Sequence, residues 1–469
     1  MRVAILHFHL RAGGVTRVIE LACAALAERG WDVLVISGEP PPAGCRLAEE
    51  QIAVVPRLRY GVAAGEEESL RKEVDAAMHR RWGASADILH LHNHALGKNF
   101  ALPPAVAEWA REGRSVLLQM HDFAEDGRPA NYRALLSQLG GSAGLRLYPM
   151  APQVAYALLN TADSRRLQSA GLTSPAGVLM NPVFLAGAGT PVSPKALGAE
   201  RYIIYPTRAI RRKNIGEALW WAAQAAPGEK IVLTAAPATG PDVARHARWR
   251  ALAEELNLPV VFDAQRLLDR PAEDFLCGAD LCLTTSVAEG FGMAFLEPWL
   301  ASLAVTGRNL PDVVGDFRAA GLVFDALYDR LDVPVESVDA INRMIAERVR
   351  AMCEDYQVPW EERFIHQARE AVFRNGLVDF GRLDETRQEA AIRAAVAKGE
   401  RQALPAGSDC RAANRAVVER DFSLSSYGLR LAALYNDVLA AKPGPVDFLP
   451  AASLLQQNLS FDDFFSLRS

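Results

Sequence analysis

Two glutamates eight residues apart, Glu289 and Glu297, flank a glycine-containing turn that follows a short apolar run at 281–284. Gly290 and Gly292 allow the backbone to approach a ligand closely, and free N–H groups at a helix start can hold hydroxyl oxygens or a phosphate. With ~1.5 Å rise per residue, the carboxylates would stand on the order of 10 Å apart, about the reach of a diphosphate linking a sugar to a ribose. The motif therefore indicates a sugar-nucleotide site; two solvated glutamates beside a helix start are the alternative.

A basic segment leaves a strand-like run at 202–206 and enters a helical pattern. It carries Arg208, Arg211, Arg212 and Lys213 near the expected helix N-terminus, where the helix dipole disfavours positive charge. A bound anion would offset this charge, and Arg208 with Lys213 would neutralise a leaving diphosphate. A solvated basic turn is the alternative interpretation.

Two segments of the first half also follow strand-like runs. Gly13 and Gly14 come after the apolar run at 2–9, and such a turn at a helix start suits a phosphate, although the nicotinamide pattern G-x-G-x-x-G is absent. His121 follows the run at 116–120, and residues at the carboxyl ends of parallel strands face the ligand crevice. Its imidazole could contact the acceptor or the transferred sugar. A bare tight turn and a structural histidine are the alternatives.

Three histidines, His90, His92 and His94, alternate along another strand-like run. Alternation would place all three on one strand face, where they could bind a metal. No carboxylate is fixed nearby in the sequence, and His94 lies where the strand should end. We therefore expect no metal site from these residues.

Strand-like and helical patterns alternate along most of the chain. The near-continuous apolar run at 2–9 is typical of a parallel strand buried on both faces, and the segments 87–92 and 116–120 are also predicted to be strands. A second alternation begins at 202 and includes a helix expected over 293–303. The pattern predicts an α/β fold of two Rossmann-like domains in tandem, with extra C-terminal helices.

A chain of 469 residues is too long for one core, so at least two domains are expected. The stretch 185–198 is rich in Gly, Ala, Pro and Ser and predicts the linker. We expect an N-terminal domain over 1–188, rejoined by the C-terminal segment 440–469, and a C-terminal domain over 199–439.

Composition excludes several classes of protein. Half of the residues are hydrophobic and the net charge is -5, so no overall field attracts nucleic acid or anionic lipid. The six cysteines form no CxxC pair, which argues against zinc knuckles and thioredoxin-type sites. With no long apolar run and no signal-peptide pattern, we expect a cytoplasmic protein without a transmembrane segment. The partly basic stretch 71–81 leaves peripheral membrane contact open, although a solvated face is favoured.

The order and spacing of these motifs resemble those of the retaining GT-B glycosyltransferases of family 4. That family has an E-x7-E element enclosing Gly-Phe-Gly, a diphosphate-binding Arg and Lys five residues apart, an N-terminal glycine-rich loop and a histidine after a central strand. The similar residues here are, in chain order, Gly13, Gly14, His121, the segment 179–183, Arg208, Lys213, Glu289 and Glu297. The resemblance covers roughly residues 1–320 and implies that the two domains face a cleft, the GT-B arrangement.

The resemblance implies transfer of a sugar from a nucleotide-diphosphate sugar with retention of configuration, by front-face displacement and without a catalytic metal or other cofactor. The first glutamate and the amides after it would hold the sugar hydroxyls, the second glutamate the ribose, and the basic pair the diphosphate. The implied donor-binding residues are Gly13, Gly14, Arg208, Lys213, Glu289, Gly290, Phe291, Gly292 and Glu297. The implied catalytic residues are His121, Arg208, Lys213 and Glu289.

The sequence departs from the family after the second glutamate. Residues 304–312 read Ala-Val-Thr-Gly-Arg-Asn-Leu-Pro-Asp instead of a Gly-Gly loop ending in Glu, so contacts from that loop are not carried over. The helical C-terminal region is also longer than usual. It would shape an unusual acceptor site or simply enlarge the domain.

Two other functions are compatible with the same fold. In a phosphorylase, free phosphate would replace the nucleotide diphosphate, but the ribose role of Glu297 would then be superfluous. A catalytically silent binding protein is disfavoured by the intact site residues. We therefore favour a hexosyltransferase whose partners are a nucleotide sugar and a small-molecule or glycan acceptor, not nucleic acid. The donor base, the sugar and the acceptor are left open.

Overall fold

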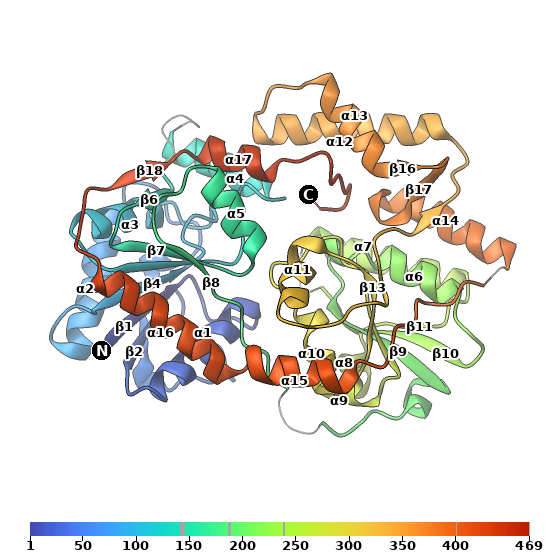
Figure 1. The fold of residues 1–469 in the computed structure, drawn as a ribbon, viewed down its shortest axis with the longest axis horizontal. Coiled ribbons are helices and arrows are strands. Elements are labelled where there is room, and N and C mark those ends of the chain that lie inside the picture. Colours follow the sequence, from blue (N-terminus) through green and yellow to red (C-terminus); the bar gives the residue numbers. More distant parts are fainter. Residues whose placement is uncertain (141–145, 186–188, 238–239, 400, 469) are drawn as a thin grey trace. The chain divides into compact units, whose positions relative to one another are not determined.

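The computed structural model describes residues 1–140, 146–185, 189–237, 240–399 and 401–468. The chain divides into two compact units (Figure 1). Unit 1 comprises Met1–Pro182, Asp355–Gln357 and Phe422–Ser460, and unit 2 comprises Val183–Glu354, Val358–Asp421 and Phe461–Ser469.

Unit 1 is built on a seven-stranded sheet in the order β3-β2-β1-β4-β5-β7-β8, in which all neighbours are parallel. The strands are β1 (Arg2–His7), β2 (Asp32–Ser37), β3 (Ile52–Val54), β4 (Ile88–His92), β5 (Val116–Met120), β7 (Val154–Leu158) and β8 (Ala176–Val178). The connecting helices are α1 (Gly14–Ala27), α2 (Glu67–Trp82), α3 (Leu102–Arg111), α4 (Pro129–Leu139) and α5 (Thr161–Ser169). Every residue of β4, β5 and β7 is buried, as expected for parallel strands covered on both faces.

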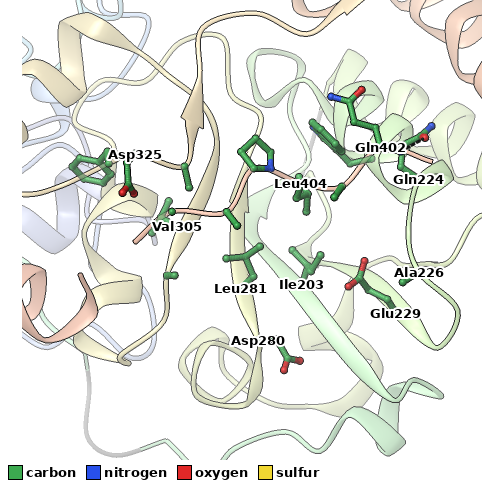
Figure 2. Close-up of a pocket in the computed structure, with 18 of the residues that line it drawn as sticks. Ile203, Gln224, Ala226, Glu229, Asp280, Leu281, Val305, Asp325, Gln402 and Leu404 are labelled. Atoms are coloured by element: carbon green, nitrogen blue, oxygen red, sulfur yellow. Dashed lines mark hydrogen bonds between the residues drawn. The ribbon is translucent and has the colours of Figure 1, made fainter. Parts of the chain in front are cut away.

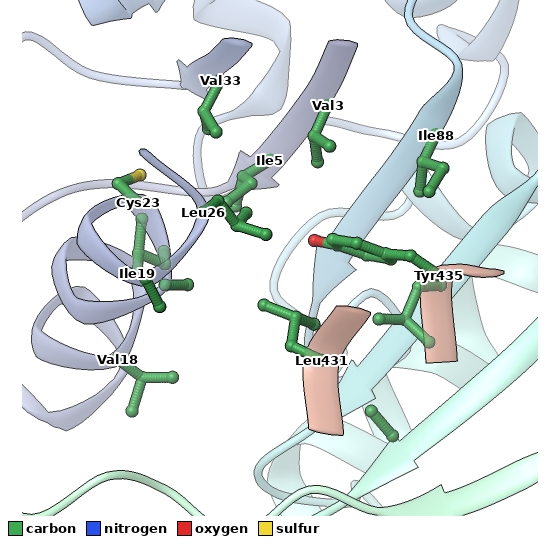
Figure 3. Packing of buried hydrophobic residues seen from close by; sticks show 14 of the residues in the cluster. Val3, Ile5, Val18, Ile19, Cys23, Leu26, Val33, Ile88, Leu431 and Tyr435 are labelled. Carbon is green, nitrogen blue, oxygen red and sulfur yellow. The ribbon is translucent and has the colours of Figure 1, made fainter. Parts of the chain in front are cut away.

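A helix from late in the sequence completes the core of unit 1. Helix α16 (Leu424–Ala440) lies beside α1 and inserts Leu431 and Tyr435 among Val3, Ile5 and Leu26 (Figure 3). Short strand β18 (Asp447–Leu449) then pairs antiparallel with β6 (Tyr148–Met150), and α17 (Ala451–Asn458) follows. The apolar stripe of α16 therefore explains why this segment belongs to unit 1.

Unit 2 contains a parallel sheet in the order β11-β10-β9-β12-β13-β14. Its strands are β9 (Arg201–Arg208), β10 (Glu229–Ala235), β11 (Val260–Val261), β12 (Leu281–Thr284), β13 (Val305–Arg308) and β14 (Leu327–Tyr328). Its connecting helices are α6 (Ile215–Ala223), α7 (Pro241–Glu255), α8 (Ala264–Leu268), α9 (Ala272–Gly278), α10 (Glu297–Leu300) and α11 (Pro311–Ala319).

Both sheets follow the doubly wound order, in which the chain starts in the middle, runs outward on one side and then crosses to the other. The reversal lies between β1 and β4 in unit 1 and between β9 and β12 in unit 2. The predicted α/β class with two Rossmann-like sheets is confirmed. Ligands of such sheets bind outside the carboxyl ends of the strands at this reversal.

The longer C-terminal region forms a subdomain of unit 2. It contains a small antiparallel sheet of β15 (Asp332–Val333), β17 (Leu377–Asp379) and β16 (Phe373–Arg374). Its helices are α12 (Val338–Tyr356), α13 (Glu362–Val372), α14 (Glu385–Lys398) and α15 (Arg411–Asp421).

The unit boundaries differ from the expected domain limits. The segment that rejoins unit 1 is 422–460, because α16 supplies core residues there, whereas 440 was the expected start. The last residues, from Phe461 onward, belong to unit 2, where Phe465 and Leu467 pack against Val287. Residues 186–188 of the expected linker lie outside the described residues.

The partly basic stretch 71–81 lies in α2, and several of its cations are paired within the chain. The ion pairs are Arg71–Glu112, Lys72–Glu68 and Arg81–Asp32. Along the part of the chain that the structure describes, no helix combines the length and apolar character needed to cross a membrane.

Candidate functional site

The predicted basic pair lies at the carboxyl edge of the second sheet. Arg208 is the last residue of β9 and its side chain is exposed. Lys213 ends a 3₁₀ turn, Arg211–Lys213, and Asn214, with φ of 51°, joins this turn to α6. Both cations are therefore placed beside the β9/β12 reversal, where a ligand of such a sheet binds.

Lys213 forms an ion pair with Glu289, which follows β12. The side chains of Lys213 and Glu289 are 16% and 8% exposed. Burial raises the pKa of Glu289, but the charges of Lys213 and Arg212 outweigh it and hold this pKa below its ordinary value. Glu289 is therefore an ionised carboxylate at neutral pH, able to accept hydrogen bonds but not to donate a proton.

Buried hydrogen bonds hold the loops after β9 and β12 together. Tyr205 Oη donates to the Lys213 carbonyl at 2.9 Å and lies 2.8 Å from Ser286 Oγ. Thr285 Oγ1 donates to the carbonyls of Lys213 and Asn214, and Asn214 Nδ2 donates to the Thr285 carbonyl at 3.1 Å. These residues were not identified from the sequence, although the polar run 284–286 after an apolar strand is a usable signal. The hydrogen bonds between these two loops hold Lys213 next to Glu289.

Glu297 and Arg208 line one cavity of about 300 Å³ at the same edge. The other polar side chains around it come from Thr207, Thr234, Gln265 and Glu273. A cation and a carboxylate facing one cavity can bind a phosphate and a hydroxyl group of the same ligand.

The helix expected over 293–303 is absent. A 3₁₀ turn, Met293–Phe295, is followed by the four-residue helix α10, which starts at Glu297. Pro298 explains this break, because proline has no N–H to donate and is tolerated only in the first turn of a helix. The separation estimated from one continuous helix therefore does not apply to Glu289 and Glu297.

Backbone geometry, rather than contact with a ligand, explains why residue 292 is a glycine. Its φ is +87°, and a Cβ there would lie 2.6 Å from Val313 Cγ1. The Phe291 ring is buried against Phe317, with ring centroids 5.5 Å apart. Only the backbone of Gly290, Phe291 and Gly292 can therefore serve the predicted sugar contacts.

Arg308, in the stretch that departs from the family pattern, is neutralised within the protein. It is fully buried between Glu217 and Asp379, with Nη2 at 2.7 Å and 2.8 Å from their carboxylate oxygens. Burial lowers the pKa of Arg308, but these two carboxylates outweigh it and raise the value. Because Asp379 belongs to β17, this triad anchors the C-terminal subdomain to β13. Arg308 is thus structural and not a further phosphate ligand.

A larger cavity, of about 620 Å³, lies at the opposite edge of the same sheet (Figure 2). Its lining includes the first residues of four strands, namely Arg201, Glu229, Leu281 and Val305. The segment carrying Gln402 and Leu404 runs past these strand starts. Because doubly wound sheets bind ligands at the carboxyl ends, this cavity is not the donor site.

In unit 1, Gly13 and Gly14 lie at the exposed start of α1, directly after β1. Gly13 has an extended backbone, with φ of 172°, which any residue adopts. A Cβ on Gly14 would meet none of the described atoms within 4 Å. The surrounding described residues therefore do not require glycine, and a ligand role for both remains a prediction.

His121 follows β5 at the carboxyl edge of the first sheet and is 8% exposed. Its backbone N–H donates to Asn93 Oδ1 at 2.7 Å, and its Nε2 lies 2.8 Å from His92 Nδ1. Burial lowers the pKa of His121 to about 4, so the ring is neutral at pH 7. It can donate or accept a hydrogen bond, but it does not supply a positive charge.

The hydrogen-bond pattern favours one tautomer of this pair. Within the described residues, His92 Nε2 is buried and has no hydrogen-bond partner. An unpaired buried acceptor costs less than an unpaired buried N–H, so the proton of His92 belongs on Nδ1 and is donated to His121. His121 then carries its proton on Nδ1, from which it can donate to a ligand.

The three alternating histidines do not share one face. His90 and His92 stack with centroids 4.5 Å apart, but Asn93, with φ of 54°, ends the strand between them and His94. His94 instead contacts the Leu147 carbonyl through Nε2 at 2.8 Å. Among the residues that the structure describes, no group of three or more candidate metal ligands is found.

Comparison with known proteins relates the chain to glycosyltransferases. Residues 13–170 match the family model described as "Glycosyl transferase 4-like domain". Mannosylglucosyl-3-phosphoglycerate synthase of Petrotoga mobilis is 26% identical over 408 residues, 80% of this chain and 77% of that protein. The chain is a glycosyltransferase, and its residues 13–170 are similar to the family-4-like domain.

Solved structures with the same fold include two that align with nearly the whole glycosyltransferase. Anabaena Alr3699/HepE, in complex with UDP and glucose, has a TM-score of 0.54 and 15% identity, covering 93% of this chain and 99% of that chain. Sucrose-phosphate synthase from Thermosynechococcus elongatus has a TM-score of 0.51 and 15% identity, covering 94% and 99%. At these identities the similarity concerns the fold, and it agrees with the two doubly wound sheets.

Proposed function

We propose that this nucleotide-sugar glycosyltransferase transfers a sugar from a nucleotide-diphosphate donor to its acceptor with retention of anomeric configuration. The observation that carries the proposal is the grouping of charges at the β9/β12 reversal. Lys213 and Glu289 form a nearly buried ion pair there, and Arg208 and Glu297 line a cavity at the same edge. This grouping matches the charge pattern of a diphosphate between a sugar and a ribose.

Each group has a distinct role in the proposal. Glu289 accepts hydrogen bonds from sugar hydroxyls, together with the amides from Gly290 to Gly292, and Glu297 accepts hydrogen bonds from the ribose. Arg208 and Lys213 neutralise the diphosphate as it leaves, which stabilises the transition state. We expect no catalytic metal or other cofactor, because these two cations supply the required positive charge.

Retention in this proposal results from attack on the same face that the diphosphate leaves. The departing phosphate oxygen accepts the proton of the acceptor hydroxyl as the new bond forms. His121 supports this step as a neutral hydrogen-bond donor, and the exposed start of α1 at Gly13 and Gly14 offers N–H groups to the donor phosphate.

Donor class is supported by the compared proteins. HepE was solved with UDP and glucose, and the Petrotoga relative is named a synthase. These names favour a transferase over a phosphate-dependent phosphorylase. Glu297 adds to this, because a ribose-binding carboxylate has no role when free phosphate is the substrate.

Substitutions at this cavity should separate binding from turnover. Glu297→Ala should weaken nucleotide-sugar binding, and Arg208→Ala should slow turnover by at least about tenfold, equivalent to roughly 1.4 kcal/mol. Calorimetric titration with the nucleotide sugar and steady-state release of nucleotide measure the two effects. Arg201→Ala is the matched control, since Arg201 is exposed at the opposite end of the same strand. Unchanged kinetics and binding in both site variants, with folding intact, would refute the assignment.

A further inference from the structure

Three loops of unit 1 are tied together at the carboxyl edge of its sheet. Asn99 Nδ2 donates to the carbonyls of Arg57 and Arg59, both at 2.8 Å. The N–H of Gly61 donates to the Lys98 carbonyl at 2.7 Å. The segment after β3 and the segment after β4 therefore have a fixed relative position.

A third loop, leading into α4, is held against the second. Asn131 Nδ2 donates to the Leu96 carbonyl at 2.9 Å. Gly97 has φ of +72°, and a Cβ there would lie 2.6 Å from the Asn131 carbonyl oxygen. This close approach requires glycine and brings Arg128, the residue before α4, close to Lys98.

These loops and the segment after β1 present a group that we call the Lys98 cluster: Lys98, Tyr60, His9 and Arg128. Lys98 Nζ lies over the Tyr60 ring, 5.8 Å from its centroid, and Tyr60 Oη lies 3.1 Å from His9 Nε2. Tyr60 is 38% exposed, so the cluster is open to solvent at this ring.

The cluster carries an uncompensated positive charge. Arg128 forms an ion pair with Asp122, and the neighbouring Arg11 forms one with Glu39. Lys98 is half-buried, and no described carboxylate lies within ion-pair distance of its ammonium. The pKa of Lys98 is lowered, mainly by burial and secondarily by the charge of the nearby Arg128. A half-buried cation without a counter-charge is costly, and an anionic ligand would remove this cost.

We infer that the Lys98 cluster binds an anionic group, a phosphate or a carboxylate, on the acceptor of this glycosyltransferase. This inference rests on the proposed function. Lys98 follows β4 on the same edge as His121, whereas the two cations proposed to neutralise the donor diphosphate, Arg208 and Lys213, belong to unit 2. The ammonium of Lys98 takes the anionic charge, and the hydroxyl of Tyr60 donates a hydrogen bond.

Binding of three-carbon probes to the full chain tests the inference. We would titrate 3-phosphoglycerate, glycerate and glycerol into the wild type, Lys98→Met and Lys98→Arg by calorimetry, with UDP present. Lys72→Met is the matched control, because Lys72 pairs with Glu68 on the surface of α2 and both side chains are 74% exposed.

We expect the wild type to bind at least one anionic probe and not glycerol. Lys98→Met should weaken that binding at least tenfold, while Lys98→Arg and Lys72→Met retain it. If 3-phosphoglycerate binds and glycerate does not, the anionic group that the cluster recognises is a phosphate. If glycerate binds as well, the cluster also recognises a carboxylate. Absence of anion binding, equal binding of glycerol, or wild-type affinity in Lys98→Met would overturn the inference.

A parallel thermal-shift measurement with UDP separates this inference from the proposed function. Lys98→Met should show the same UDP-induced shift as the wild type. Loss of that shift in Lys98→Met would assign Lys98 to the donor and overturn the acceptor assignment. If UDP, GDP and ADP all failed to shift the wild type, the proposed function would fail. Anion binding, repeated without nucleotide, would then still report on the cluster itself.

Discussion

Unit 1 should unfold on mild acidification, with most of its stability lost between pH 7 and pH 5. The cause is a set of five buried histidines whose pKa values lie far below the ordinary 6.5. They are His7, His90, His92, His94 and His121. Burial is the largest cause of each shift, and the other rings lower the pKa of His92 further.

The direction of the effect follows from proton binding. In the unfolded chain these histidines protonate near pH 6.5. In the folded unit, burial lowers the pKa of His7 and His90 to about 3 and that of His94 and His121 to about 4, and it holds the pKa of His92 well below its ordinary value. Their contribution is therefore fully present above pH 6.5 and is lost as pH falls. Each of the four histidines whose pKa is about 3 or 4 should lower the stability of unit 1 by about 2 kcal/mol between pH 7 and pH 5. Together they approach the total stability of a typical domain, about 5–15 kcal/mol.

One buried acid acts in the opposite direction. Burial raises the pKa of Glu125 to about 7, and Tyr148 Oη donates to its carboxylate at 2.8 Å. Its contribution is present below the unfolded pKa and is lost as pH rises through 7. On acidification from pH 7 to pH 5, protonation of Glu125 therefore increases the stability of unit 1 by about 2 kcal/mol. This gain is smaller than the loss caused by the histidines.

Urea unfolding followed by circular dichroism at pH 7, 6 and 5 measures this loss. His94→Asn should reduce the difference between pH 7 and pH 5 by about 2 kcal/mol, whatever it does to stability at pH 7. The surface variant His79→Asn should leave the difference unchanged. A stability that is flat from pH 7 to pH 5 would show that these rings are not held neutral by burial.

Removal of the Lys213 ammonium should have the largest effect on catalysis. Lys213→Met is expected to lower kcat by about 10²–10³-fold, the usual cost of losing one group that stabilises developing negative charge. Lys213→Arg should retain more activity, because it keeps the charge. Release of nucleotide from the preferred donor measures the effect.

The same substitution leaves Glu289 nearly buried without its partner, so a folding defect must be separated from a catalytic one. In the double variant Lys213→Met/Glu289→Gln, the ion pair is replaced by two neutral groups. This variant should melt close to the wild type and remain as inactive as Lys213→Met. Recovery of turnover in the double variant would mean that Lys213 only balances the charge of Glu289.

The positions of the site residues could be predicted because strand ends are readable in the sequence. Arg208 lies two residues after the apolar run at 202–206 and His121 directly follows the run at 116–120, and parallel strands place such residues at one edge of a sheet. The ion pair between Lys213 and Glu289 could not be predicted, since it depends on hydrogen bonds from Tyr205 and Thr285 that join two loops distant in sequence.

The differences between the sequence prediction and the structure have separate physical causes. A continuous helix was expected over 293–303, but Pro298 separates the 3₁₀ turn from α10, and Ser302, with φ of 57°, lies just beyond the last residue of α10. Alternation alone would group His94 with His90 and His92, but the strand end expected near His94 is confirmed, because Asn93, with φ of 54°, follows the last residue of β4. The return of α16 to unit 1 depends on a long-range contact with α1 that no local pattern encodes.

The central claim, that unit 2 binds a nucleoside diphosphate at the β9/β12 reversal, is tested most directly by thermal shift of the full chain. UDP, GDP and ADP would each be added to the wild type and to the double variant Arg208→Ala/Glu297→Ala. At one hundred times its Kd, the preferred nucleotide should stabilise the wild type by about 2.7 kcal/mol, raising Tm by several degrees, and should not shift the double variant. An absence of any shift in the wild type, or an equal shift in both proteins, would contradict the account.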